Sequence, residues 1–137
     1  MEFQMERIGI AIFTLVLATT CFADENLYVC NALTVLELSE SGALEHSDFA
    51  KALAMHQSRF AVDRKTGVVA GGPFATVDAT DGRILSSGTD QEALKIVWLT
   101  NAPFNHLKYL WVRAYAEGTK KPFLGVTGNM VITGTCE

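Results

Sequence analysis

The sequence predicts an all-β fold: a mainly antiparallel small barrel or sandwich of about seven or eight strands, with one short helix. Two observations favour it. Short segments with alternating apolar and polar residues recur along the chain, and Gly-containing turns separate them. The chain has 137 residues and an apolar share of 49%, which suits one domain with its own core.

The first expected strand covers residues 27–38, a run rich in Leu and Val that ends at the polar segment 39–42. The only helix-like stretch follows Ser47, whose hydroxyl is a favoured helix cap. Phe49 and Leu53 lie on one face of this stretch, among good helix formers. We expect a helix of about two or three turns that packs on the sheet.

The remaining expected strands form hairpins. Gly67 is expected to adopt the left-handed conformation that closes the turn after residue 63. Asp81-Gly82 is a strong two-residue hairpin sequence, and 127–129 is expected to join the last two strands. The extended segments between these turns, from which the seven or eight strands are expected, are 59–63, 68–70, 75–78, 83–85, 94–100, 108–116, 123–126 and 130–136.

Residues 1–23 have the three regions of a secretory signal peptide. A basic residue precedes an apolar run over 8–18, and small residues lead to a cleavage position after Ala23. The run is shorter than the roughly 20 residues that span a bilayer. We therefore expect a periplasmic or secreted protein with a single domain over 24–137. The alternatives are an uncleaved anchor or a lipidated Cys21, the only expected links to a membrane.

Removal of the signal peptide leaves two cysteines, Cys30 and Cys136. An even pair in an exported domain predicts a structural disulfide. On the chain-entropy model, a bridge over so long a loop contributes about 4–5 kcal/mol. It would tie the last strand to the first and bring the sheet towards closure. Zinc binding is disfavoured, because no further Cys or His lies near either residue in the sequence.

The charge balance argues against a nucleic-acid partner. The whole chain carries a net charge of −4, and the chain without residues 1–23 carries 13 acidic and 10 basic residues. Phosphate binding needs clustered Lys and Arg, whereas adjacent basic residues occur here only as the two separate pairs Arg64-Lys65 and Lys120-Lys121.

No sequence pattern predicts a catalytic, cofactor or metal site. The three histidines lack the spacing of paired metal ligands, and the segment 86–88 lacks the flanking residues of a nucleophile elbow. The aspartates between 78 and 90 lack the spacing of a calcium loop. We therefore expect a protein that is not an enzyme and holds no cofactor.

The segment 109–115 carries the strongest binding signal. A period of two places Tyr109, Trp111, Arg113 and Tyr115 on one face of a strand, opposite an aliphatic face. These residue types are enriched at binding hot spots, and Trp98 on the preceding strand is expected to extend the patch. The alternative is that this face is buried under the helix or a second sheet.

Three segments, 60–67, 121–125 and 134–136, together resemble small exported bacterial proteins of uncharacterised function. The resemblance covers much of the exported chain and implies no activity.

The start Tyr28-Val29-Cys30 combined with Cys136 is similar to the periplasmic inhibitors of c-type lysozyme. This resemblance implies a small β-barrel held by one disulfide. Those inhibitors plug the lysozyme cleft with a Ser-Gly loop followed by a Tyr. Here Ser87-Gly88 is followed by Thr89-Asp90, with no Tyr nearby in the sequence.

These observations favour an exported protein-binding or accessory domain of the cell envelope, with a protein as its partner. An inhibitor of a cell-wall-degrading enzyme is the second hypothesis. A hydrolase whose site assembles only in the fold is the third.

Overall fold

The computed structural model describes residues 24–75, 82–99 and 106–137. In these segments the fold is mainly antiparallel β with a single short helix, which confirms the predicted fold class. The predicted signal peptide, most of the predicted strand 75–78 and Asp81 of the predicted turn lie outside the described residues.

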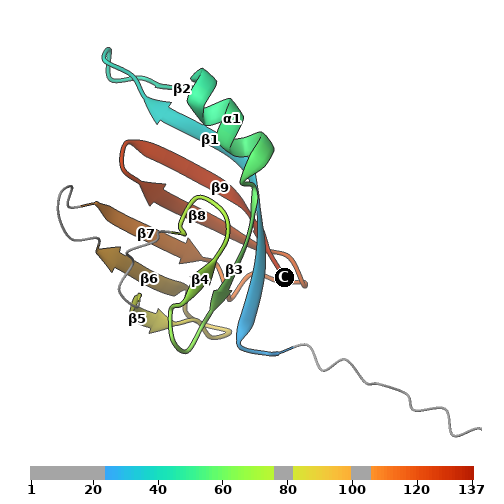
Figure 1. The fold of residues 1–137 in the computed structure, drawn as a ribbon. Coiled ribbons are helices and arrows are strands. Elements are labelled where there is room, and N and C mark those ends of the chain that lie inside the picture. Colours follow the sequence, from blue (N-terminus) through green and yellow to red (C-terminus); the bar gives the residue numbers. More distant parts are fainter. Residues whose placement is uncertain (1–23, 76–81, 100–105) are drawn as a thin grey trace, which may run out of the picture.

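All described strands belong to one antiparallel sheet that curls into a half-barrel (Figure 1). Its order is β4-β3-β1-β9-β8-β7-β6-β5, and β2 pairs with β1. The elements are β1 (Leu27–Leu38), β2 (Leu44–Glu45), α1 (Asp48–His56), β3 (Arg59–Asp63), β4 (Val69–Ala70), β5 (Arg83–Ser87), β6 (Leu94–Leu99), β7 (Leu107–Val112), β8 (Lys121–Thr127) and β9 (Met130–Cys136).

The concave side of the sheet holds the core. Phe60 lies 5.1 Å from Phe74 and 5.4 Å from Phe123, both measured between ring centroids and both edge-to-face. Phe74 also stacks on Trp98 at 6.0 Å. Large side chains therefore fill the interior of the half-barrel, as in other small barrels.

Phe74 enters this core because Gly125 leaves room for it. A Cβ atom at position 125 would lie 2.1 Å from the Cζ atom of Phe74. Gly125 is thus required by close packing and not by an unusual backbone angle.

The predicted helix is present as α1, and the hydroxyl of Ser47 accepts a hydrogen bond from the backbone N–H of Ala50 at 3.0 Å. Ala50 is fully buried, and α1 packs against β1. No helix within the described segments is long and apolar enough to cross a membrane.

The predicted disulfide joins Cys30 to Cys136, which are register partners on β1 and β9. Beside them, Val29 and Glu137 exchange two backbone hydrogen bonds of 2.9 Å. The expectation that the bridge brings the sheet towards closure is wrong, because β1 and β9 are neighbouring interior strands and the sheet edges are β4 and β5.

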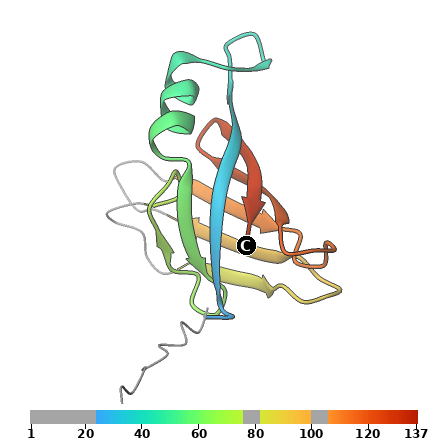
Figure 2. The same cartoon turned by 90° about the vertical axis from the view of Figure 1, so that its right-hand side faces the viewer.

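Among the described residues, side chains and not paired strands bridge the gap between β4 and β5, here called the seam. The indole N–H of Trp98 donates to the carbonyl oxygen of Gly67 at 2.8 Å. The Arg64 guanidinium donates to the carbonyls of Ser87 and Gly88. Gly67 has a φ of 72°, as predicted for this turn, and Figure 2 shows the β3–β4 hairpin folded beside β5 and β6.

Candidate functional site

The predicted binding segment divides into a strand and a loop. On β7, Leu110 and Val112 are buried while Tyr109 and Trp111 are half-buried on the convex outer face, as the alternation predicted. The strand ends at Val112, earlier than expected. The backbone N–H of Ala114 donates to the carbonyl of Val112 at 2.8 Å, which marks a turn in the backbone. The chain therefore leaves the strand although apolar residues still alternate in the sequence.

Arg113 and Tyr115 belong to the loop that follows β7, yet they remain beside Trp111. The Cζ atom of Arg113 lies 5.6 Å from the ring centroid of Trp111 and 5.6 Å from that of Tyr115. Both distances are within the range of cation–π interactions. The guanidinium is therefore held next to two aromatic rings.

A depression of about 460 Å³ lies beside Trp111 on the outer face. We call it the aromatic hollow. Lys95 is the register partner of both Trp111 and Ser86, so three adjacent strands supply its floor. The lining residues are Leu85, Ser86, Gln91, Glu92, Ala93, Lys95, Trp111 and Tyr115.

Sequence reasoning missed the contribution of β5, β6 and their connecting loop to this hollow. One signal was present in the sequence, because Lys95 stands between the apolar residues Leu94 and Ile96 and so belongs to the opposite face of the strand. The loop residues Gln91 and Glu92 carry no periodic signal that would place them next to Trp111.

The prediction that Trp98 extends the aromatic face is wrong. Trp98 is only 1% exposed and lies on the concave side, opposite Lys108 in the register. It shares the buried positions of β6 with Leu94 and Ile96. Its indole N–H is occupied by Gly67, as described above.

The alternative prediction, that the helix or a second sheet covers Trp111, does not agree with the positions of the described elements. Every described strand belongs to the same sheet, and α1 packs against β1. Tyr115 is 41% exposed and Leu85 54%. The outer face of β7 thus faces solvent in the part of the chain that the structure describes.

The loop containing Ser87-Gly88 lies next to the loop containing Tyr115. A Cβ atom at Gly88 would lie 3.0 Å from the Cβ atom of Ala114, the residue before Tyr115. Figure 2 shows the two loops at the same end of the half-barrel. The fold therefore places a tyrosine near the Ser-Gly loop, although none is near in the sequence.

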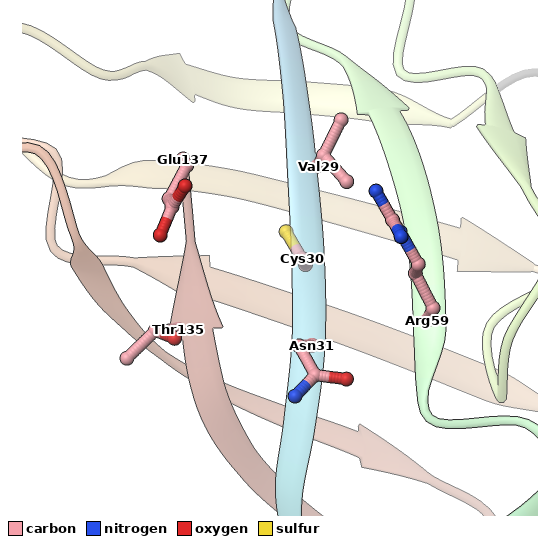
Figure 3. Close-up of a pocket in the computed structure, with 6 residues that line it drawn as sticks. All are labelled: Val29, Cys30, Asn31, Arg59, Thr135 and Glu137. Atoms are coloured by element: carbon pink, nitrogen blue, oxygen red, sulfur yellow. The ribbon is translucent and has the colours of Figure 1, made fainter.

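A second depression, of about 560 Å³, lies on the outer face over β3, β1 and β9. Figure 3 shows Arg59 and Glu137 on opposite sides of β1, with Asn31 and Thr135 also lining the depression. The Glu137 carboxylate pairs with Lys120 at 3.7 Å. Polar side chains line this second depression, and no aromatic residue is among its lining residues.

Lys108 is a buried amine whose contacts are structural. Its Nζ donates to the carbonyls of Pro73, Phe74 and Ala75 at 3.2–3.3 Å and so holds the segment that carries Phe74. Burial lowers the pKa of Lys108 from its usual value, because desolvation disfavours the charged form.

The histidines are not assembled into a site. His46 Nδ1 lies 3.1 Å from the Val35 carbonyl, His56 ends α1 and His106 precedes β7. Within residues 24–75, 82–99 and 106–137, no three His, Cys, Asp or Glu side chains are grouped to hold a metal ion.

Comparison with protein-family models, with curated proteins and with solved structures gives no significant match for this chain. The chemistry of the chain's own side chains is therefore the basis for assigning a function, and the aromatic hollow is the strongest candidate site.

Proposed function

We propose that this protein is an exported, non-enzymatic domain of the cell envelope that binds a protein partner through the aromatic hollow. The disulfide and the apolar N-terminal segment support export. Trp, Tyr and Arg are the residue types that most often dominate protein–protein binding energy. All three types meet at this hollow.

One observation carries the proposal: Arg113 lies against Trp111 and Tyr115 on a sheet face that no described element covers. Contiguous exposed apolar area is uncommon on monomeric proteins unless something binds it. Here Leu85 and Leu124 add to the rings, at 54% and 37% exposure. A partner would remove this area from water without disturbing the core on the other side.

The test compares Trp111→Ala with Phe49→Ala. Phe49 is 60% exposed on α1, so its truncation is a matched control for losing an exposed aromatic ring elsewhere. Each tagged protein is expressed from its full sequence, purified after export, and used to capture cross-linked partners from its own envelope fraction. A captured protein is then purified and its affinity is measured by calorimetry.

We expect Trp111→Ala to weaken binding of the purified partner by about 2 kcal/mol or more, as for a hot-spot residue. Phe49→Ala should bind like the wild type, and both variants should keep the wild-type melting temperature. Equal binding by Trp111→Ala and wild type would refute the proposal.

A second candidate, inhibition of a cell-wall-degrading enzyme, is favoured by the proximity of the Ser87-Gly88 loop to the loop bearing Tyr115. Two neighbouring loops at one end of a rigid sheet are suited to entering an enzyme cleft. This arrangement supplies the aromatic residue that the lysozyme-inhibitor resemblance requires and the local sequence lacks.

This candidate is tested by adding the purified protein to a c-type lysozyme and following lysis of a cell-wall suspension. Inhibition near equimolar protein, reduced by Tyr115→Ala but not by Phe49→Ala, is the expected result. Undiminished lysis at a large molar excess would exclude inhibition of this enzyme class.

A further inference from the structure

We infer that the aromatic hollow selects an acidic protein segment, one that presents an Asp or Glu carboxylate beside an apolar side chain. The inference rests on the proposed protein-binding function and adds the chemistry of the partner to it. It is carried by the charges around the hollow and by the contacts of Arg113.

Three cations lie on or beside this part of the outer face. Lys95 on β6 is the register partner of Trp111. Arg83 on β5 is the register partner of Val97, two residues further along β6. Arg113 directly follows the end of β7. Neither ion pair found among the described residues involves any of the three. Their charge is therefore available to a partner.

Negative charge at the hollow is small by comparison. Glu92 is the only carboxylate among the lining residues, and its Oε2 accepts a hydrogen bond from the Ser86 hydroxyl at 3.1 Å. Arg113, held against two of the lining rings, adds a second cation to Lys95, so positive charge exceeds negative charge at the hollow itself. Asp90 and Glu117, the nearest other acidic residues in the sequence, do not line it.

This excess is local, because the chain as a whole carries a net charge of −4. Acidic residues gather elsewhere: Glu37, Glu40 and Glu45 line a depression near β2. Interfaces place opposite potentials against each other, which speeds encounter and rejects partners of like charge. The partner surface that fits the aromatic hollow is accordingly acidic.

Arg113 adds geometric selectivity for a carboxylate. Within the described segments its guanidinium donates no hydrogen bond, while the rings of Trp111 and Tyr115 hold it in place. A planar guanidinium can donate two parallel N–H bonds to one carboxylate. Because the group is already positioned, less conformational freedom is lost on binding.

The apolar part of the hollow specifies what lies next to that carboxylate. Leu85 lies in the lining with Trp111, and Leu124 is the register partner of Trp111 on β8. An apolar side chain adjacent to the Asp or Glu would cover this area.

The test uses two fluorescein-labelled peptides of equal length with Leu and Phe at the same positions and either Glu or Lys at the others. Binding to the full purified protein is followed by fluorescence anisotropy. We expect the Glu peptide to bind at least tenfold tighter than the Lys peptide. Its affinity should fall as sodium chloride is raised, because exposed charges are screened.

Variants locate the effect. Arg113→Lys should lose at least fivefold in affinity for the Glu peptide, since it keeps the charge but not the two-pronged donor. Lys95→Gln should also bind more weakly, whereas Lys51→Gln, which removes an exposed lysine on α1, should bind like the wild type. Circular dichroism confirms that each variant is folded.

Equal binding of the two peptides, or unchanged affinity in both Arg113→Lys and Lys95→Gln, would overturn the inference. So would preferential binding of phosphatidylglycerol vesicles, or Trp111-dependent self-association in sedimentation. If partner capture depends on Trp111 but not on Lys95, Arg113 or the salt concentration, the proposed function stands and only the acidic character of the partner is rejected. Capture indifferent to Trp111 would reject the proposed function itself.

Discussion

The indole N–H of Trp98 donates a hydrogen bond to the carbonyl oxygen of Gly67, 2.8 Å away and 31 positions distant in the sequence. The bond crosses from β6 to the turn between β3 and β4. It joins the two ends of the sheet, which no pairing between described strands joins. A single buried side chain therefore helps to hold the half-barrel curled.

Trp98→Phe is expected to lower the free energy of unfolding by roughly 2–4 kcal/mol, because it leaves an unfilled volume and removes the donor to Gly67. Chemical denaturation measures the change. Trp111→Phe is the control and should stay within about 0.5 kcal/mol of the wild type, as a substitution at the surface. Equal decreases in the free energy of unfolding for the two variants would contradict the conclusion that Trp98 is buried and Trp111 lies at the surface.

Gly125→Ala is expected to destabilise the fold by about 1–3 kcal/mol, because the added methyl group would lie 2.1 Å from the Cζ atom of Phe74. Combining it with Phe74→Leu, which shortens the opposing side chain, should cost less than the sum of the two single changes. Strictly additive unfolding energies would show that these positions do not meet.

How far the sequence predicts this fold depends on whether a feature is local. The alternation on β7 correctly placed Leu110 inward and Trp111 outward, and Ser47 correctly marked the helix start. The turn at Ala114 was hidden because the alternation of Val112, Ala114 and Ala116 continues through it, with no Gly or Pro before Gly118. The seam was not predictable, because it depends on how the whole sheet curls.

The candidate site shows the same division. Trp111 and Tyr115 were named from the sequence, but Lys95, Glu92 and Leu85 join them only through strand register and loop position. Trp98 alternates in phase with Leu94 and Ile96, so the pattern along β6 places it on the buried face and not beside Trp111.

Cys30→Ser is expected to lower the free energy of unfolding by about 2–5 kcal/mol, because the bridge limits the unfolded chain over a sequence separation of 106. Denaturation of the wild type with and without reductant provides a matched measurement. Identical midpoints in the two conditions would show that the bridge does not stabilise the domain.

Acid should weaken the β3–β4 turn through Asp63. Its Oδ1 accepts hydrogen bonds from the backbone N–H groups of Lys65 at 2.7 Å and Thr66 at 2.9 Å. These bonds, Thr66 first, lower the pKa of Asp63 below its usual value. The unfolded state then binds more protons, so this stabilisation is complete above the unfolded pKa of 3.8 and is lost as the pH falls through the folded pKa.

Asp63→Asn should therefore flatten the acid side of the curve of unfolding free energy against pH, since asparagine keeps an acceptor oxygen but does not titrate. Chemical denaturation at several pH values between about 2 and 6 covers the range in which carboxylates titrate. An unchanged or steeper acid dependence in the variant would show that Asp63 does not contribute.

The Cys30–Cys136 bridge also decides how the domain responds to mechanical tension. A force that pulls the segment before Cys30 away from Glu137 passes through the covalent bridge, so the chain between the two cysteines is not stretched. In the reduced protein the same force would act on the antiparallel β1–β9 ladder from one end and separate its hydrogen bonds one after another. Reduction would turn a domain that cannot be extended between its two cysteines into one that unzips along β1 and β9.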